Sequence, residues 1–420
     1  MNQDTDQTTA WLRTAAHCAR AASAILANTP DTVRAAGLKS AAAQLRVQAP
    51  AILAANEADL LAHQGTPAFR DRLALTPARV EAMAQGLDSI AALPDPLART
   101  LADWTRPNGL RIRRIAQPLG VIGMIYESRP NVGADAAGLC VKSGNAVILR
   151  GGSDSARSAQ AIHAAIAEGL HAAGLPRDAV QVAPGADRAY VAAMLAGSGL
   201  IDLVIPRGGR SLVDRVQRDA RVPVLAHAEG LCHTYVHAAA DPAMARSVLA
   251  NAKMRRTGVC GATETLLIDA ACAPALLPLL VGDLAALGCR FRADARARAI
   301  LPDLPLATEA DFATEWLDAI LSVAVVDGVA DALAHIARYG SEHTEAIITE
   351  DAAAADQFLR GVGSAVALWN ASTQFCDGGE FGFGAEIGIA TGRIHARGPV
   401  GVEQLTTFRY TITGTGQVRP

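Results

Sequence analysis

The 420-residue chain has few aromatic residues, only 4% of its length, and almost no excess of charge, with a net value of -3. Few aromatics together with many alanine-rich stretches suit helices packed on sheets better than an all-β sandwich. The balance of interspersed charges gives no reason to expect a nucleic-acid or anionic-membrane partner. A small-molecule partner is therefore expected.

Long apolar runs, a leader segment and paired cysteines are also missing. No stretch reaches the roughly 18 uninterrupted apolar residues of a membrane span, and the first residues, Met1 to Thr9, are polar and acidic. The seven cysteines are scattered, without a Cys-x-x-Cys pair for zinc or redox chemistry. We therefore expect a cytoplasmic protein without a disulfide framework and without a metal site.

The length accommodates about two or three lobes. Residues 11–93 have a helical pattern throughout, with breaks at Thr29-Pro30 and at Leu75-Thr76-Pro77. From Val121 onward, short apolar runs alternate with helical patterns, which predicts βαβ units and parallel, doubly wound sheets. The predicted strands are Val121–Tyr126, Ala146–Leu149, Val180–Ala183 and Ile201–Ile205 in a first series, and Thr234–Ala238, Thr263–Ile268, Ser322–Val326, Ala346–Thr349 and Ala365–Trp369 in a second. Two α/β lobes meeting near Glu229-Gly230 are expected.

A small β element accompanies the two lobes. Residues 110–116 alternate apolar and polar side chains after the Pro107-Asn108-Gly109 turn, which predicts a hairpin with one charged face. Residues 405–413 form a Thr-rich and aromatic terminal strand. The arginines of the first strand would suit RNA, but no aromatic residues interleave with them for base stacking. An exposed or subunit-pairing strand is the favoured interpretation.

Cys260 stands in a distinctive loop, Arg255-Arg-Thr-Gly-Val-Cys-Gly-Ala-Thr-Glu-Thr265. A free thiol has a pKa of about 8.5, so a nucleophilic cysteine needs positive potential or nearby donors. Lys253, Arg255 and Arg256 are candidates to supply that potential, and the flanking glycines allow a ligand to approach closely. A buried inert thiol is the ordinary alternative, and the other six cysteines take that interpretation. We predict that Cys260 is a nucleophile.

Two loops are candidates for binding an anionic cofactor, although no Gly-x-Gly-x-x-Gly motif occurs. Leu149-Arg-Gly-Gly-Ser-Asp-Ser155 and Pro206-Arg-Gly-Gly-Arg-Ser211 each follow a predicted strand and open a predicted helix. Free backbone N–H groups and the positive end of a helix dipole suit an anion there. Either loop alone would pass for a plain βα turn, but together they predict a nucleotide cradle.

Several long segments then resemble a known family, the gamma-glutamyl phosphate reductases of the aldehyde dehydrogenase superfamily. Besides the Cys260 loop, these segments are Asp71–Thr76, Leu93–Pro96, Pro118–Val132, Lys142–Gly152, Phe381–Ala390 and Arg393–Pro399. The resemblance implies two doubly wound, Rossmann-like lobes with a β oligomerisation element. Residues 1–105 and 117–229 would bind NADP, residues 230–397 would be catalytic, and residues 106–116 and 398–420 would supply oligomerisation strands.

The resemblance also implies an activity: NADPH-dependent reduction of gamma-glutamyl phosphate to glutamate 5-semialdehyde in proline biosynthesis, by a homo-oligomer whose upstream partner is glutamate kinase. Cys260 would be the nucleophile and Asn131 the side-chain donor of an oxyanion hole, for which a plain turn residue is the alternative. The implied cofactor contacts are Arg150 and Ser153 for the adenosine ribose, Gly208, Gly209 and Ser211 for the pyrophosphate, and Glu315 for the nicotinamide ribose.

Glu229 aligns with the glutamate that activates water in hydrolytic members of the superfamily. A phosphorylating reductase gains nothing from hydrolysis, so Glu229 is a candidate proton relay or a structural group. The resemblance further implies that the amino-acid head and the phosphate are bound by Ser341, His343, Arg393 and His395, for which ordinary surface contacts are the alternative. Two other functions stay open: a hydrolytic NAD(P)-dependent aldehyde dehydrogenase and a catalytically silent oligomeric scaffold.

Overall fold

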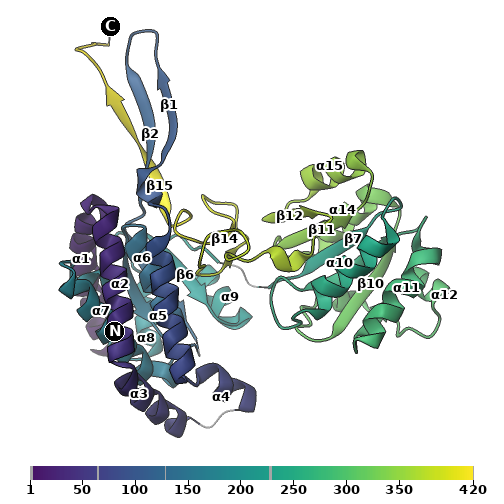
Figure 1. The fold of residues 1–420 in the computed structure, drawn as a ribbon, viewed down its shortest axis with the longest axis horizontal. Helices are drawn as coiled ribbons and strands as arrows, with labels where there is room; N and C mark the ends of the chain where they lie inside the picture. The colour runs from purple at the N-terminus through teal and green to yellow at the C-terminus, as the bar shows by residue number, and fades with distance from the viewer. Residues whose placement is uncertain (1–2, 64–65, 128, 227–228, 420) are drawn as a thin grey trace. The chain divides into compact units, whose positions relative to one another are not determined.

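The computed structural model describes residues 3–63, 66–127, 129–226 and 229–419 and divides the chain into two compact units (Figure 1). Unit 1 comprises Met1–Ala226, Gly382–Gly388 and Val400–Pro420, and unit 2 comprises His227–Phe381 and Ile389–Pro399. The division after Ala226 lies three residues before the Glu229-Gly230 boundary expected from the sequence. The segment Gly382–Gly388 also differs from that expectation, because it packs with unit 1.

Five helices form the N-terminal part of unit 1: α1 (Gln3–Asn28), α2 (Asp31–Val47), α3 (Ala49–Ala62), α4 (Pro67–Leu73) and α5 (Pro77–Ala92). The two predicted breaks are confirmed. Pro30 separates α1 from α2, and at the start of α5 the Thr76 hydroxyl accepts a hydrogen bond from the Arg79 amide at 3.2 Å, with Pro77 in the first turn.

A four-stranded parallel sheet forms the centre of unit 1, with the strand order β5-β4-β3-β6. Its strands are β3 (Val121–Tyr126), β4 (Ala146–Arg150), β5 (Val180–Val182) and β6 (Leu203–Arg207), and its helices are α6 (Val132–Lys142), α7 (Ala156–Ala172), α8 (Arg188–Leu195) and α9 (Arg210–Asp219). The doubly wound α/β fold is thus confirmed. The strand order reverses between β3 and β6, and ligands bind at such a switch point in open α/β sheets.

Short 3-10 turns connect several of these elements: η1 (Pro96–Ala98), η2 (Ser153–Ser155), η3 (Arg177–Ala179) and, in unit 2, η4 (Thr373–Phe375).

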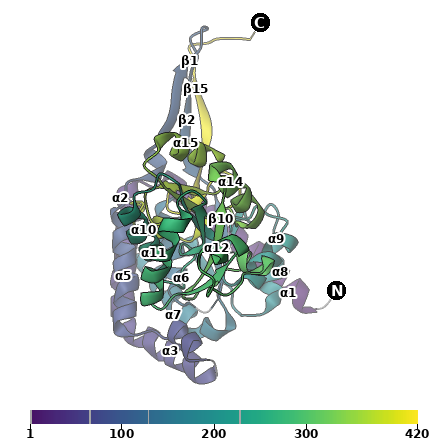
Figure 2. The same cartoon turned by 90° about the vertical axis from the view of Figure 1, so that its right-hand side faces the viewer.

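A three-stranded antiparallel sheet projects from the helices of unit 1 as a narrow arm (Figures 1 and 2). It consists of β1 (Thr100–Thr105), β2 (Arg111–Pro118) and β15 (Thr406–Thr413), in the order β1-β2-β15. Strand β1 pairs antiparallel with β2 across the Pro107–Gly109 turn, so the hairpin predicted from the sequence is confirmed. The bounds of β1 were not predicted, because most of its residues are exposed. Trp104 and Tyr410 contact each other on the arm, their ring centroids 6.2 Å apart.

Unit 2 contains a six-stranded parallel sheet with the order β12-β11-β7-β8-β10-β9. Its strands are β7 (Cys232–Val236), β8 (Thr263–Asp269), β9 (Arg290–Ala293), β10 (Ile320–Val326), β11 (Thr344–Ile348) and β12 (Val366–Trp369), and β13 (Ile389–Ala390) pairs with β14 (Gly398–Pro399). The helices are α10 (Pro242–Met254), α11 (Ala273–Ala286), α12 (Ala295–Ile300), α13 (Glu309–Phe312), α14 (Gly328–Tyr339) and α15 (Ala352–Gly361).

Apolar clusters cover both faces of this sheet. One gathers around Leu277 and Leu321, and the other around Phe358 and Tyr235. The short edge strand β9 was not predicted, because arginines at alternate positions hide its apolar face in the sequence. No helix in the described part of the chain is long and apolar enough to cross a membrane.

Candidate active site

The Cys260 loop of unit 2 joins the end of α10 to the start of β8, as the sequence predicted. Cys260 is partly exposed, and its backbone packs directly against Gly230. A Cβ added to Gly230 would lie 2.0 Å from the Cys260 carbonyl oxygen, a separation that no real contact allows. The loop after Glu229 and the cysteine loop therefore fit together only because residue 230 has no side chain.

Gln374 holds the stretch that precedes Cys260. Its amide nitrogen donates hydrogen bonds to the carbonyl groups of Asn251 at 3.2 Å, Ala252 at 2.9 Å and Arg256 at 3.2 Å. Its amide oxygen accepts from the Arg255 guanidinium at 3.2 Å. Asn251 and Ala252 lie in the last turn of α10, and Arg256 follows the helix. One buried side chain therefore fixes the end of α10 and the start of the nucleophile loop.

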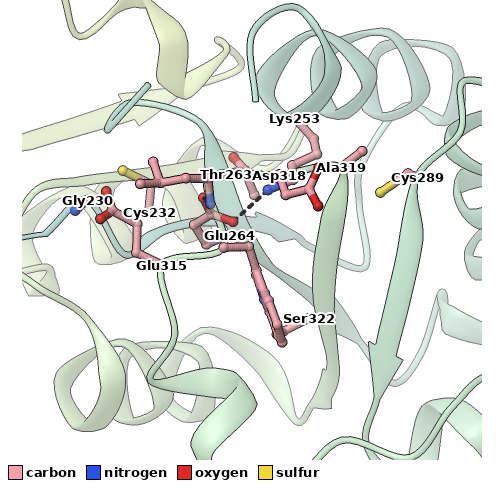
Figure 3. Close-up of polar contacts among 12 residues, drawn as sticks. Gly230, Cys232, Lys253, Thr263, Glu264, Cys289, Glu315, Asp318, Ala319 and Ser322 are labelled. Carbon is pink, nitrogen blue, oxygen red and sulfur yellow. Dashed lines mark hydrogen bonds and ion pairs between the residues drawn. The ribbon is translucent and has the colours of Figure 1, made fainter. Parts of the chain in front are cut away.

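Lys253 lies at the centre of the same region, where Figure 3 shows it directed at Glu264. Both side chains are buried, and Lys253 Nζ lies 2.5 Å from Glu264 Oε2. The other carboxylate oxygen of Glu264 accepts from the Leu317 amide at 3.2 Å. Burial raises the pKa of Glu264 to about 7, and Lys253 opposes that rise. The charge of Lys253 is thus compensated within unit 2, which differs from the expectation that it serves the Cys260 thiolate.

Glu315 and Glu229 flank Gly230. The Gly230 amide donates to Glu315 Oε1 at 2.8 Å, and Figure 3 shows these two residues close together. Glu315 thus fixes the backbone of Gly230, which packs against Cys260. Burial raises the pKa of Glu315 above its ordinary value, and the nearby charge of Glu229 raises it further, whereas the Gly230 hydrogen bond lowers it. The structure therefore brings Glu229, Glu315 and Cys260 together around one glycine.

Ser341 and His343 contact Leu231 and Cys232, the two residues that follow Gly230 in the chain. Ser341 Oγ accepts from the Leu231 amide at 2.9 Å. His343 is fully buried, 2.9 Å from the Thr344 hydroxyl and 3.5 Å from the Cys232 sulfur. Cys232 in turn donates to the Cys260 carbonyl at 3.1 Å, and burial raises the pKa of its thiol well above the ordinary value. Cys232 is thus a protonated support for the nucleophile loop, a role that sequence reasoning missed.

Arg393 forms an exposed ion pair with Glu342 at 2.8 Å, and its hydrogen bond holds the pKa of that carboxyl below the usual range. Arg397 shares the same partner at 3.3 Å and donates to the Gly363 carbonyl at 2.9 Å. His395 is exposed nearby in the chain. The structure thus gives Arg393 and Arg397 a surface role, and their contact with substrate stays a prediction.

The two anion-binding loops predicted from the sequence lie at the carboxyl ends of β4 and β6 in unit 1. A cavity of about 260 Å³ is lined there by Glu127, Arg150, Arg188, Val191, Ser211, Leu212 and Arg215. Arg150 is almost fully buried, donates to the Ala186 carbonyl, and has a second guanidinium nitrogen, Nε, without a hydrogen-bond partner among the described residues. Ser153 begins η2 and is exposed, and it is not among the lining residues.

A second cavity of about 260 Å³ lies at the switch point between β3 and β6. Its lining residues are Arg72, Glu127, Arg129, Arg207, Gly208 and Gly209. Glu127 Oε2 accepts from the Gly209 amide at 3.3 Å, and a Cβ on Gly208 would lie 2.5 Å from the same carboxylate. A glycine pair, a helix start and several guanidinium groups together fit a phosphate-bearing cofactor.

Asn131 stands immediately before α6 in unit 1. Its amide donates to Asp135 at 3.4 Å, one helical turn along, and it lines a third cavity with that residue. Burial raises the pKa of Asp135 to about 6. The Asn131 amide nitrogen is thus held by the Asp135 carboxylate. The role of Asn131 as the oxyanion donor stays a prediction.

Comparison with known proteins identifies the family. The model of the aldehyde dehydrogenase family matches residues 3–295. The chain is 70% identical over 420 residues to the gamma-glutamyl phosphate reductase of Acidiphilium cryptum, with full coverage of both chains. The protein belongs to the gamma-glutamyl phosphate reductase branch of the aldehyde dehydrogenase family.

Solved structures agree with this placement among the reductases. The crystal structure of gamma-glutamyl phosphate reductase from Thermotoga maritima matches with a TM-score of 0.95 at 40% identity, covering 97% of this chain and 100% of that one. An acetylating aldehyde dehydrogenase from Geobacillus thermoglucosidasius shares the fold, with a TM-score of 0.69 at 19% identity and full coverage of both chains. The fold predicted from the sequence is confirmed.

Replacing Gly230 by alanine should inactivate this reductase, because the new Cβ must displace the Cys260 backbone. We expect a fall in kcat/KM of about 100-fold or more, since small displacements of a reacting group cost that much. Gly258→Ala is the matched control in the same loop, where the nearest heavy atom, the Leu317 carbonyl oxygen, would be 3.8 Å away. Equal activity of the two variants would contradict the tight packing of Gly230 on Cys260.

Proposed function

We propose that this protein reduces L-gamma-glutamyl 5-phosphate to L-glutamate 5-semialdehyde, with release of phosphate, in proline biosynthesis. The identity of 70% over the whole chain to a named reductase carries the choice of substrate. The fixed, partly exposed Cys260 loop supports a covalent mechanism. The enzyme would work in the cytoplasm, with glutamate kinase supplying its substrate.

Cys260 performs the first step as a thiolate. Its sulfur attacks the acyl carbon, the bond between that carbon and the phosphate oxygen breaks, and phosphate leaves. Three contacts hold the loop during this step: Cys232 donates to the Cys260 carbonyl, Gly230 packs against the Cys260 backbone, and Gln374 holds carbonyl groups of the preceding stretch. Asn131 is the predicted donor to the oxygen on which negative charge develops.

The Cys260 thioester would be reduced by a hydride, which a nicotinamide cofactor would supply when bound. The carbon–sulfur bond of the reduced adduct then breaks, which releases the aldehyde and restores the thiolate of Cys260. Glu315, fixed by the Gly230 amide, remains the predicted contact for the nicotinamide ribose. Glu229 does not activate water in these steps, because the thioester is not hydrolysed.

The cofactor is proposed to be NADPH. The cavity that contains Arg150 also contains Arg188 and Arg215, and an added 2′-phosphate would meet these cations. The NADPH proposal thus depends on these three arginines more than on Ser153, the residue that the sequence placed beside the ribose. The ratio of kcat/KM for NADPH to that for NADH measures the preference.

A homo-oligomer is proposed as well, paired through the arm of unit 1. The strand β15 exposes Phe408, Tyr410 and Ile412, each at least 43% accessible. Exposed apolar side chains on an edge strand are typical of a surface that pairs with another chain.

The reverse reaction tests the proposed function. With glutamate semialdehyde and NADP, reduction of NADP should require phosphate, because the acyl group waits on Cys260 for a nucleophile. Glu229→Gln should leave this phosphate-dependent rate within about twofold. The hydrolytic alternative predicts the opposite: steady turnover without phosphate, release of glutamate, and loss of activity in Glu229→Gln. Absence of any NADP reduction would favour the silent scaffold.

A further inference from the structure

A cavity of about 360 Å³ in unit 1 shares only Arg72 and Arg129 with the two cavities proposed for the cofactor. It is lined by residues of α4, α5, the loop between them, α6 and the turn that precedes α6: Asp71, Arg72, Ala74, Leu75, Arg79, Ala82, Met83, Arg129, Asn131 and Asp135. Its volume lies within the range of small-molecule sites. Asn131 is the predicted contact for the reacting acyl oxygen, so the rest of a substrate held at Asn131 would extend along this cavity.

Two of the lining residues, Arg79 and Asp71, are paired with each other. The Arg79 guanidinium donates to the Ala74 carbonyl at 2.6 Å and pairs with the Asp71 carboxylate at 3.0 Å. These contacts fix the corner between α4 and α5. Arg79 and Asp71 therefore neutralise each other and shape the cavity.

Arg72 and Arg129 are shared between two cavities. Both line this cavity and also the neighbouring cavity of Gly208 and Gly209 at the switch point. Arg129 lies two residues before Asn131, so the same turn carries a cation and the predicted oxyanion donor. Two guanidinium groups next to a predicted acyl site match a ligand with an anion at the end remote from the reacting carbon, because the guanidinium fork pairs well with a carboxylate.

The opposite charge is also available in the cavity. Asp135 is held one helical turn after Asn131, at 3.4 Å from its amide nitrogen, and has the sign that attracts an ammonium group. An amino-acid head carries one carboxylate and one ammonium, which is the charge pair that Arg72, Arg129 and Asp135 complement.

We propose that this cavity binds the amino-acid head of the substrate, with Arg72 and Arg129 on its α-carboxylate and Asp135 on its α-ammonium. The inference rests on the proposed function, since it assumes a glutamyl substrate. It also assigns head recognition to unit 1, whereas the resemblance gave Ser341, His343, Arg393 and His395 of unit 2 as candidates for the head and the phosphate.

Steady-state kinetics of the full-length enzyme in the reverse direction test the assignment. Arg72→Ala and Arg129→Ala should each raise KM for glutamate semialdehyde about 10- to 100-fold, the usual result of losing a charged hydrogen-bond partner. KM for phosphate should stay within about twofold in both variants. Kd for NADP should stay within about twofold in Asp135→Asn, because Asp135 lines this cavity and not the cofactor cavity at the switch point. Arg129→Lys should lie between wild type and Arg129→Ala, because lysine keeps the charge and loses the fork. Asp135→Asn should also raise KM for the semialdehyde.

Arg177→Ala is the matched control, because Arg177 is an exposed arginine of unit 1 that pairs with Glu168 and lines a separate cavity. Unchanged KM for the semialdehyde in the Arg72 and Arg129 variants would overturn the inference while leaving the proposed function intact. A rise in KM for phosphate alone would also overturn it, because the two arginines would then bind the phosphoryl group. A wild-type enzyme that does not act on glutamate semialdehyde would instead refute the proposed function.

Discussion

Replacing Cys260 by alanine should abolish reduction of the acyl substrate, with a fall in kcat on the order of 10⁴-fold or more, because alanine has no sulfur to form the covalent intermediate. The proposed cofactor cavities lie in unit 1 and Cys260 in unit 2, so Kd for NADPH should stay within about twofold. NADPH oxidation measures turnover, and mass spectrometry of the acylated wild-type enzyme should locate the thioester on Cys260.

Cys272→Ala is the appropriate control for this experiment. Cys272 lies in unit 2 at the start of α11, and burial raises the pKa of its thiol to about 11, so it is protonated at neutral pH. Cys232 is a poor control, because its thiol donates to the Cys260 carbonyl and its loss should lower activity through the loop. Turnover near the wild-type level in Cys260→Ala would refute the thioester mechanism.

Replacing Lys253 by methionine should destabilise the protein by about 3–5 kcal/mol, the usual effect of removing one partner of a buried ion pair. Both side chains are at most 1% exposed, so Glu264 would be left as a buried carboxylate without its cation. Urea unfolding measures the loss. On the same helix, Arg246 pairs with Asp283 on the surface, and Arg246→Met should cost less than about 1 kcal/mol.

The pH dependence of the Lys253→Met variant should reveal Glu264 as the cause. Burial already raises the pKa of Glu264 to about 7, and loss of Lys253 removes the main influence that lowers it. A carboxyl with a raised pKa in the folded state stabilises folding below its unfolded pKa and loses that contribution as the pH rises through the folded value. The variant should therefore lose stability between pH 5 and pH 8 more steeply than the wild type.

A second substitution provides the control. Glu264→Gln in the Lys253→Met background removes the charge and keeps an oxygen for the Leu317 amide. The double variant should recover most of the lost stability, because a neutral buried pair has a small desolvation cost. A double variant as unstable as Lys253→Met at pH 8 would show that Lys253 acts by packing and not by its charge.

Local sequence patterns were sufficient for much of the fold. The apolar runs of β3, β4, β8 and β10 are fully buried in the two sheets, and such runs stand out in the sequence because both faces of a central parallel strand are covered. The strand β1 contains no such apolar run, since its residues are mostly exposed, and only the Pro107–Gly109 turn indicated the hairpin to which it belongs. The edge strand β9 was hidden by Arg290 and Arg292 for a related reason, because only part of its surface faces the core.

The sequence by itself determined the two α/β lobes, the arm strands around residues 110–116 and 405–413, and the glycine-flanked loop of Cys260, since each depends on neighbours in the chain. Only the tertiary structure decided which partner each charged side chain has. Lys253 is compensated by Glu264, Arg393 by Glu342, and the exit of α10 is held by Gln374, which is 118 residues beyond Arg256 in the chain. Periodicity and motifs describe local preference, but a charged side chain is paired by whichever group the fold brings within a few ångströms.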